Sequence, residues 1–266
     1  KEFVSKKLTK VDISTDSRDP NTPLDDNQKT SFRQSLGQLR WCTDQTRPEA
    51  AFEALEFSTK ANNATIKDAK MLNKVIEEVK KTQNEIRFPK IGSDSWTITV
   101  FANAAFKNLG PDKTSSAYGY LIFLTNGFSI GKRGPALLIA FKSAKIKRVT
   151  TSTFESEALA QSEAIDRALL ERHKLSVMTN IPEELIRVEC LSDCNDFVQA
   201  VYSSKMHQKA GRVAVDIAKI RECVENKEIA DIKWLPTEYM LADCLTKRGV
   251  NAALLRQTLR DGKFAI

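Results

Sequence analysis

Trp96-Thr-Ile-Thr-Val-Phe-Ala102 is the stretch that decides the fold, because apolar residues alternate with threonines over most of its length. Such alternation is typical of a β-strand. Two further apolar runs follow, from Ala117 to Leu124 and from Ala136 to Phe141, and the turn sequence Gly131-Lys-Arg-Gly134 separates them. Three neighbouring runs joined by turns predict an antiparallel meander of three strands.

The chain after this meander alternates between helical and strand patterns. The pattern predicts helices over 152–173, 195–202 and 212–223, and a fourth and a fifth strand over 186–190 and 231–235. Ser152 begins the long helix, and Thr237 is expected to cap a further helix after the fifth strand. This is a mixed α/β order, in which functional sites tend to lie at the carboxyl ends of strands.

The N-terminal third has a different pattern. Ser31, Pro48 and Thr65 mark the expected starts of three short amphipathic helices, which together predict a small bundle. The polar segment before them lacks apolar periodicity, which indicates a tail or a strap. The predicted organisation therefore has four parts: a polar tail over 1–29, a helical segment over 30–90, an α/β domain over 95–248, and a C-terminal helix or tail over 249–266.

The composition is that of a globular protein. The 266 residues are 41% hydrophobic and 28% charged, which excludes full disorder, a collagen and a coiled-coil rod. No apolar run approaches the ~20 residues that cross a bilayer. Because Lys1 to Lys10 is charged and lacks the apolar core of a signal peptide, we expect a protein that is not secreted and is cytoplasmic, nuclear or both.

The net charge and the types of residue that could bind a metal limit the kinds of ligand and metal ion that we expect. A net charge of +7 favours an anionic partner, nucleic acid first, although a basic protein without such a partner fits the charge equally well. The five cysteines form no Cys-x-x-Cys pair and there are only two histidines, which argues against a structural zinc site. A metal here would be held by oxygen ligands, which indicates Mg²⁺ or Mn²⁺.

Three acidic residues follow one another at the ends of predicted elements. Glu157 lies in the first turns of the long helix, Asp193 follows the fourth strand, and Asp243 lies on the helix expected after the fifth strand. One acidic residue at such a place is more often a cap or a solvated charge. Three of them could converge on two divalent ions about 4 Å apart. Glu155 competes with Glu157, but its distance of three residues from Ser152 is the capping-box spacing and predicts a helix cap.

The chain also contains short motifs at these positions: Ser152-Thr-Phe-Glu-Ser-Glu157, Lys233-Trp-Leu-Pro-Thr-Glu238 with Leu241-Ala-Asp-Cys-Leu-Thr-Lys247, and Ser35-Leu-Gly-Gln-Leu-Arg-Trp41 with Gln45-Thr-Arg-Pro-Glu49. The first resembles the Ser-Thr-Glu-Ala-Glu helix start of copia-type retrotransposon Pol polyproteins. The second, the most specific, resembles the closing motif of that family, and the third resembles its segment after the polymerase palm. The resemblance covers about 31–247, and the order of elements resembles a ribonuclease H fold.

This resemblance implies a fold, a reaction and a partner. The implied fold is α/β, with a ribonuclease H-like five-stranded mixed sheet and flanking helices, preceded by the small helical bundle as a thumb or connection region. The implied activity is binding of an RNA/DNA hybrid and two-metal hydrolysis of its RNA strand, with Mg²⁺ or Mn²⁺ held by Glu157, Asp193 and Asp243. The implied partner is the reverse-transcriptase polymerase portion of the same polyprotein.

Asn103 departs from the family pattern, which has an aspartate at this position of the first strand. An amide is neutral and offers a metal only one oxygen. The departure predicts impaired catalysis with an intact fold, and both a diverged element copy and a deliberate inactivating substitution would explain it. The alternative function is that of a catalytically inactive ribonuclease H-fold module. Its role would be binding or structural, in a reverse transcriptase or in a domesticated element.

Basic residues precede the long helix: Lys142, Lys145, Lys147 and Arg148. They are candidates for contact with a phosphate backbone, although a solvated loop is equally compatible with the pattern. His207 lies in a loop after the 195–202 helix. A histidine in such a loop helps product release in some ribonucleases H, so the resemblance makes His207 a weaker candidate.

Overall fold

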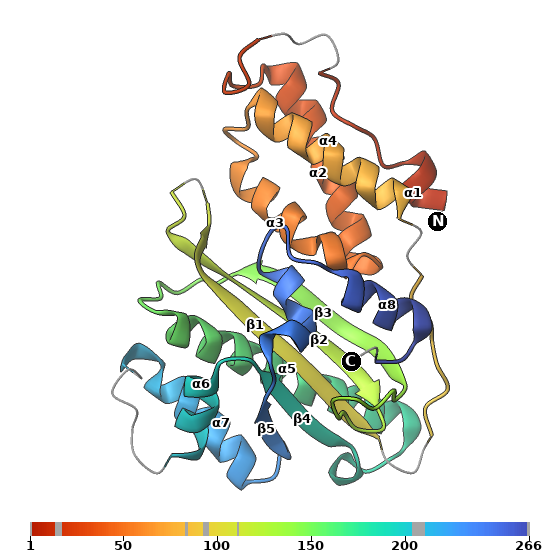
Figure 1. The fold of residues 1–266 in the computed structure, drawn as a ribbon, viewed down its shortest axis with the longest axis vertical. Helices are drawn as coiled ribbons and strands as arrows, with labels where there is room; N and C mark the ends of the chain where they lie inside the picture. Colours follow the sequence, from red (N-terminus) through yellow and green to blue (C-terminus); the bar gives the residue numbers. More distant parts are fainter. Residues whose placement is uncertain are drawn as a thin grey trace.

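The computed structural model describes residues 2–13, 18–82, 85–92, 96–110, 112–203 and 211–264. Figure 1 shows a group of helices stacked on one end of an α/β domain. The sheet strands are β1 (Thr97–Leu109), β2 (Ser115–Thr125), β3 (Ala136–Lys145), β4 (Arg187–Ser192) and β5 (Asp231–Trp234). No helix among the described residues is long and apolar enough to cross a membrane.

The sheet has the order β3-β2-β1-β4-β5. β1 pairs antiparallel with β2 and β2 antiparallel with β3, whereas β4 runs parallel to both β1 and β5. The predicted meander and the predicted five-stranded mixed sheet are therefore confirmed. In parallel pairs the carboxyl ends meet at one edge, so the ends of β1 and β4 are the place to look for a site.

Two apolar layers hold the sheet, one on each face. Val100 and Ala102 of β1 face the cluster formed with α5 (Thr153–Thr179), α6 (Asn195–Tyr202) and α7 (Ala214–Glu225). Phe101, between them, faces the opposite cluster with η5 (Leu241–Leu245) and α8 (Ala253–Asp261). Alternate β1 residues thus serve opposite layers, as the period of two in the sequence requires.

The helical region consists of α1 (Glu2–Lys6), α2 (Asp26–Gln45), α3 (Ala51–Lys60) and α4 (Ile66–Lys81), with a 3₁₀ turn, η1 (Pro48–Ala50), before α3. Thr65 caps α4 as predicted, and Asp68 completes the capping box. Ser31 does not cap α2, which was wrongly expected to begin there. Instead Asp25 accepts from the Gln28 amide and the Gln28 side chain accepts from the Asp25 amide, so the helix begins six residues earlier.

The segment predicted as a polar tail contains buried apolar residues. Leu8, Val11 and Leu24 belong to the same apolar cluster as α2 and α4. The Val11 backbone exchanges hydrogen bonds with the Asn73 side chain on α4, at 2.8 Å and 2.9 Å. This part of the chain therefore packs along the bundle as a strap, the second of the two structures that the sequence left open.

The chain after β5 forms tight 3₁₀ turns, η4 (Thr237–Tyr239) and η5, where a helix capped by Thr237 was expected. No side chain caps η4, since the Thr237 hydroxyl donates to Oδ2 of Asp193 at 3.1 Å. The hydroxyl thus holds a carboxylate from a neighbouring strand end, and Asp243 lies on a 3₁₀ turn.

The helical region docks on the sheet domain through α3. Phe52 and Leu55 of α3 are buried against Leu109 and Ala117 of the meander. Arg248, just after η5, pairs with Glu56 at 3.0 Å and lies over the Phe57 ring, 5.1 Å from its centroid. The residues that follow η5 are therefore anchored to α3.

Glu53, near this interface, gives a prediction about pH. Burial raises the pKa of Glu53 from 4.5 to about 7, and the Arg248 charge opposes the rise. The folded chain keeps this proton up to about pH 7, whereas the unfolded chain releases it near pH 4.5. Stability from this group is therefore greatest below pH 4.5 and falls as the pH rises to about 7, by about 3 kcal/mol at most.

We expect Glu53→Gln to remove this dependence, so that the variant exceeds the parent in free energy of unfolding at pH 8 but not at pH 4.5. Urea unfolding across this pH range measures the difference. Glu222→Gln, at an exposed position of α7, is the control and should follow the parent. A Glu53→Gln curve parallel to the parent's would show that Glu53 does not carry the effect.

Candidate active site

The candidate residues meet where the parallel pairing of β1 with β4 ends, in the middle of β1 and at the carboxyl end of β4. The last pair of that register is Phe101 with Leu191, so Asn103 lies two residues further along β1 and Asp193 lies just beyond the end of β4. Gln161 of α5 ties these strand ends together, because its Nε2 donates to the carbonyls of both Ala102 and Leu191, at 3.3 Å and 3.0 Å.

Asn103 contacts Asp243 directly, although 140 residues separate them in the chain. The Asn103 side chain is 1% exposed, and its Nδ2 donates to Oδ1 of Asp243 at 2.7 Å and to Oγ1 of Thr246 at 3.0 Å. The ammonium of Lys247 pairs with the same Oδ1 of Asp243. One carboxylate oxygen of Asp243 thus receives two donors.

Glu157 is the most buried of the three acids, at 3% exposed. Its Oε1 accepts from the Ala104 amide at 3.1 Å, and its Oε2 is buried without a hydrogen-bond partner among the described residues. Burial raises the pKa of Glu157 well above its ordinary value, and the charges of Asp193 and Asp243 raise it further. A buried carboxylate with an open oxygen and like-charged neighbours is costly for a fold and marks a functional-site candidate.

Asp193 is more accessible than Glu157. Burial also raises the pKa of Asp193, and the charge of Asp243 adds to the effect, whereas the Thr237 hydroxyl and the Lys247 charge oppose it. Glu157, Asp193 and Asp243 therefore lie within electrostatic reach of one another and of one lysine.

Glu155 has the helix-capping role that its spacing predicted. Its amide donates to Oγ of the N-cap residue Ser152 at 3.2 Å, and its Oε2 accepts from the Thr151 amide at 2.6 Å. Glu155 thus closes the start of its own helix, while Glu157 is directed to β1.

The donor set can be tested against a divalent cation. Carboxylate oxygens suit Mg²⁺ and Mn²⁺, and the open Oε2 of Glu157 is a free donor atom. Among the described residues, no three His, Cys, Asp or Glu side chains stand close enough to hold a metal ion. Mg²⁺, however, often takes one or two carboxylates and completes its shell with water and substrate phosphate. Glu157, with its open Oε2, and Asp193 would be the two carboxylates for one such ion, whereas Asp243 already has two donors on Oδ1.

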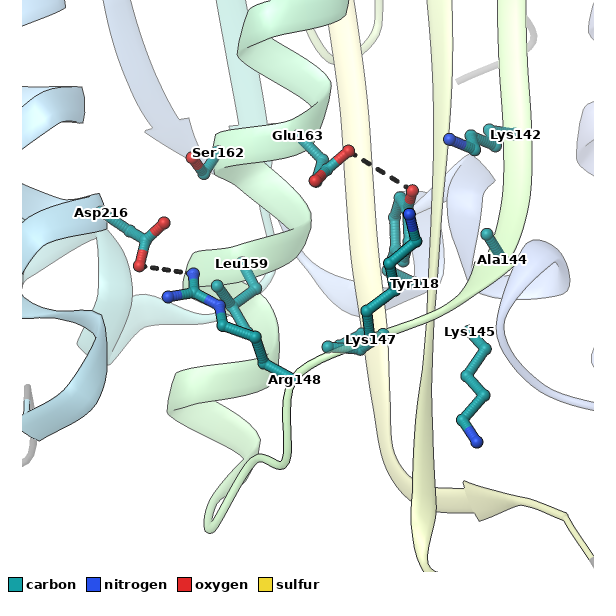
Figure 2. Close-up of a pocket in the computed structure, with 11 residues that line it drawn as sticks. Tyr118, Lys142, Ala144, Lys145, Lys147, Arg148, Leu159, Ser162, Glu163 and Asp216 are labelled. Atoms are coloured by element: carbon teal, nitrogen blue, oxygen red, sulfur yellow. Dashed lines mark hydrogen bonds and ion pairs between the residues drawn. The ribbon is translucent and has the colours of Figure 1, made fainter.

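The four candidate basic residues line a hollow of about 260 Å³ between β3, α5 and α7. In Figure 2, Lys142 and Lys147 point toward Tyr118 and Glu163, whereas Lys145 points away. Arg148 pairs with Asp216 of α7 at 2.6 Å. Asp216 and Glu163 thus partly balance the positive charge of the hollow. Lys142 and Lys147 are the two lysines that point into it.

The hollow and the carboxylates lie on different sides of α5. Leu159, Ser162 and Glu163 line the hollow and share one helix face by their spacing of three and four. Glu157 and Gln161, which contact β1, share another face. His207 lies outside the described residues.

Sequence reasoning did not identify Lys247 and Thr237 as parts of this site. The spacing of four residues between Asp243 and Lys247 was a usable signal, since such a pair faces one side of a helical turn. No local signal connects Thr237 to Asp193, because their contact depends on how β4 and β5 pair.

No protein-family model matches the chain, and no curated protein matches it. Solved structures do match. The N-terminal RNase H domain of a Mycobacterium tuberculosis protein, fused to maltose-binding protein, is 14% identical, with 57% of this chain and 91% of that chain covered and a TM-score of 0.37. An RNase H1 isolated from compost by a metagenomic approach is 20% identical, with 60% and 99% covered and a TM-score of 0.37.

A foamy viral protease-reverse transcriptase in complex with dsDNA is 16% identical, with 61% of this chain and 97% of that chain covered and a TM-score of 0.37. The chain has a ribonuclease H-like fold. That assignment rests on the strand order β3-β2-β1-β4-β5 and the strand directions, and the likenesses concern the fold alone.

Proposed function

We propose that this chain binds RNA/DNA hybrids with its ribonuclease H-like domain and hydrolyses the RNA strand very slowly or not at all. The observation that carries the proposal is the cluster of Glu157, Asp193 and Asp243 beside the middle of β1 and the carboxyl end of β4. Burial and like-charged neighbours raise the pKa of Glu157 and Asp193, which supports a functional role for the cluster.

Each residue has a role in this proposal. Glu157 and Asp193 would hold a divalent ion, which would lower the pKa of a water and stabilise charge on a phosphate. Gln161 fixes the strand ends that carry the site, and Thr237 orients Asp193. Asn103 cannot replace an aspartate, since its Nδ2 donates to Asp243 and its amide carries no charge.

We further propose the larger context that the sequence motifs imply. Residues 30–90 would be the thumb or connection region of a copia-type retrotransposon reverse transcriptase, and the polymerase portion of the same polyprotein would be the partner. The docking of α3 on the meander, with Arg248 held by Glu56 and Phe57, supports one working unit of helical region and sheet domain. A binding module without any cleavage is the second candidate, favoured by the two donors on Asp243.

Hybrid binding at increasing salt tests the proposal. We expect the affinity of the full chain for a short RNA/DNA hybrid, in chelator, to fall with salt as phosphate contacts require. Lys147→Met should weaken binding and lower the slope of log affinity against log salt by about 1. Lys132→Met is the control, because the exposed Lys132 lies in the turn at the opposite end of β3. Absence of salt-sensitive hybrid binding would reject the proposal, and equal effects of the two variants would remove the hollow from it.

A further inference from the structure

Lys247 is the cation that pairs with the carboxylate cluster of Glu157, Asp193 and Asp243. Its ammonium pairs with Oδ1 of Asp243, and the same charge opposes part of the rise that burial causes in the pKa of Glu157 and of Asp193. One cation therefore acts on all three acids. A divalent ion shared between carboxylates would have the same electrostatic effect.

The position of Lys247 is fixed by its neighbours. Its amide donates to the Asp243 carbonyl at 3.2 Å, and the Thr246 amide donates to the same carbonyl at 3.1 Å, so the residue belongs to the end of the η5 turn. The next residue, Arg248, is anchored on Glu56 and the Phe57 ring. The chain thus holds Lys247 between η5 and α3, beside Asp243.

The Asn103 amide adds the second donor. Thr246 Oγ1 donates to the Asp243 carbonyl, so it accepts from Asn103, and a carboxylate can only accept. The Asn103 amide nitrogen, and not its oxygen, must therefore face Thr246 Oγ1 and the Asp243 carboxylate, and this is the orientation in the structure. An aspartate at 103 would place a carboxylate oxygen about where Nδ2 lies, 2.7 Å from Oδ1 of Asp243, and two such oxygens repel unless a cation or a proton joins them.

We propose that Lys247 is a built-in counter-charge for Asp243 and that Asn103 adds a neutral donor to the same oxygen, so that the two take the place of a second divalent ion and this chain binds one ion and folds without metal. The inference rests on the proposed function only in taking Glu157, Asp193 and Asp243 as the metal-binding group. The ion bound would be a hard divalent cation on Glu157 and Asp193, with Mn²⁺ as the probe.

Counting bound Mn²⁺ tests the first half of the proposal. Electron paramagnetic resonance of free Mn²⁺, titrated with the full chain in the absence of nucleic acid, should give one bound ion for the parent and two for Asn103→Asp. Asn108→Asp is the matched control, because Asn108 also lies on β1 and donates to the Thr246 carbonyl, and it should bind one ion. No bound ion or two in the parent, or no gain in Asn103→Asp, would overturn the proposal.

Lys247→Met tests the counter-charge itself. Without the ammonium, we expect Mn²⁺ to bind about tenfold more tightly, and the melting temperature to fall in chelator and recover when Mn²⁺ is added. Lys233→Met is the control, because Lys233 is 43% exposed against 42% for Lys247 and also pairs with a buried carboxylate, that of Glu189.

Lys233→Met should also lower the melting temperature but without recovery in Mn²⁺. Equal Mn²⁺ affinity in Lys247→Met and the parent would overturn the proposal, as would recovery of both variants. These measurements use no nucleic acid, so their failure is distinct from a failure of hybrid binding.

Discussion

Replacing Asn103 by aspartate is expected to raise the rate of RNA-strand hydrolysis by about 10²–10³-fold, the range associated with a single electrostatic stabiliser. The reason is the charge that the substitution adds in the middle of β1. A second carboxylate would face Asp243 at the place where the Asn103 amide now donates. The resulting pair requires a cation, and the family resemblance implies a shared metal ligand there.

Hybrid binding should change little in the same variant, because the phosphate contacts that we propose for Lys142 and Lys147 are on the other side of α5. Cleavage of a labelled hybrid by the parent and Asn103→Asp, at matched salt and Mg²⁺, measures the effect. Asn108→Asp should leave the rate at the parent's level. Equal rates in the parent and Asn103→Asp would show that Asn103 is not part of the catalytic group.

Gly119→Ala is expected to destabilise the fold by about 3 kcal/mol, at the upper end of the cost of overpacking. A Cβ at Gly119 would lie 2.4 Å from Cβ of Leu245 and 3.3 Å from the Leu245 backbone. Since the clash is with the short η5 turn, the turn must move, and Asp243 moves with it. Because Gly119 of β2 has no side chain, η5 packs close to β2 and Asp243 on η5 can reach Asn103.

Gly37→Ala is the matched control, because it adds the same methyl group inside α2, where nothing lies within 4 Å. Alanine is the better helix former, so this variant should gain about 0.5–1 kcal/mol. Urea unfolding measures both variants. A Gly119→Ala variant as stable as the parent would contradict the close packing of β2 against η5.

The sequence predicted the sheet well, because the strands carry their own pattern. Alternation around Trp96 to Ala102 and the turn at Gly131 are local signals, and local pairing of neighbouring strands follows from them. The start of α2 was misplaced for a local reason too, since Asp25 and Gln28 form a capping box that outweighs Ser31. The 3₁₀ turns after β5 were not predicted because they depend on tertiary contacts, such as that of Thr237 with Asp193.

Different parts of the site were accessible to sequence reasoning for different reasons. Glu157 lies in the first turns of α5, Asp193 directly follows β4 and Asp243 lies on the turn that follows β5, so the order of elements alone indicated that they could meet. The donors that hold them were not predictable in this way. Gln161 reaches two strands at once, and the contact of Asn103 with Asp243 spans 140 residues, so both depend on packing that only the folded chain defines.

The most direct test of the central claim, that Asn103 and Glu157 belong to one site, is the rate of hybrid cleavage by Asn103→Asp compared with the double variant Asn103→Asp/Glu157→Gln. Both are measured at the same Mg²⁺, after circular dichroism has shown equal folding. The account predicts that the double variant falls back to the rate of the parent, because Oε2 of Glu157, which has no hydrogen-bond partner among the described residues, would be an essential ligand of the proposed ion. A double variant that cleaves as fast as Asn103→Asp would contradict it.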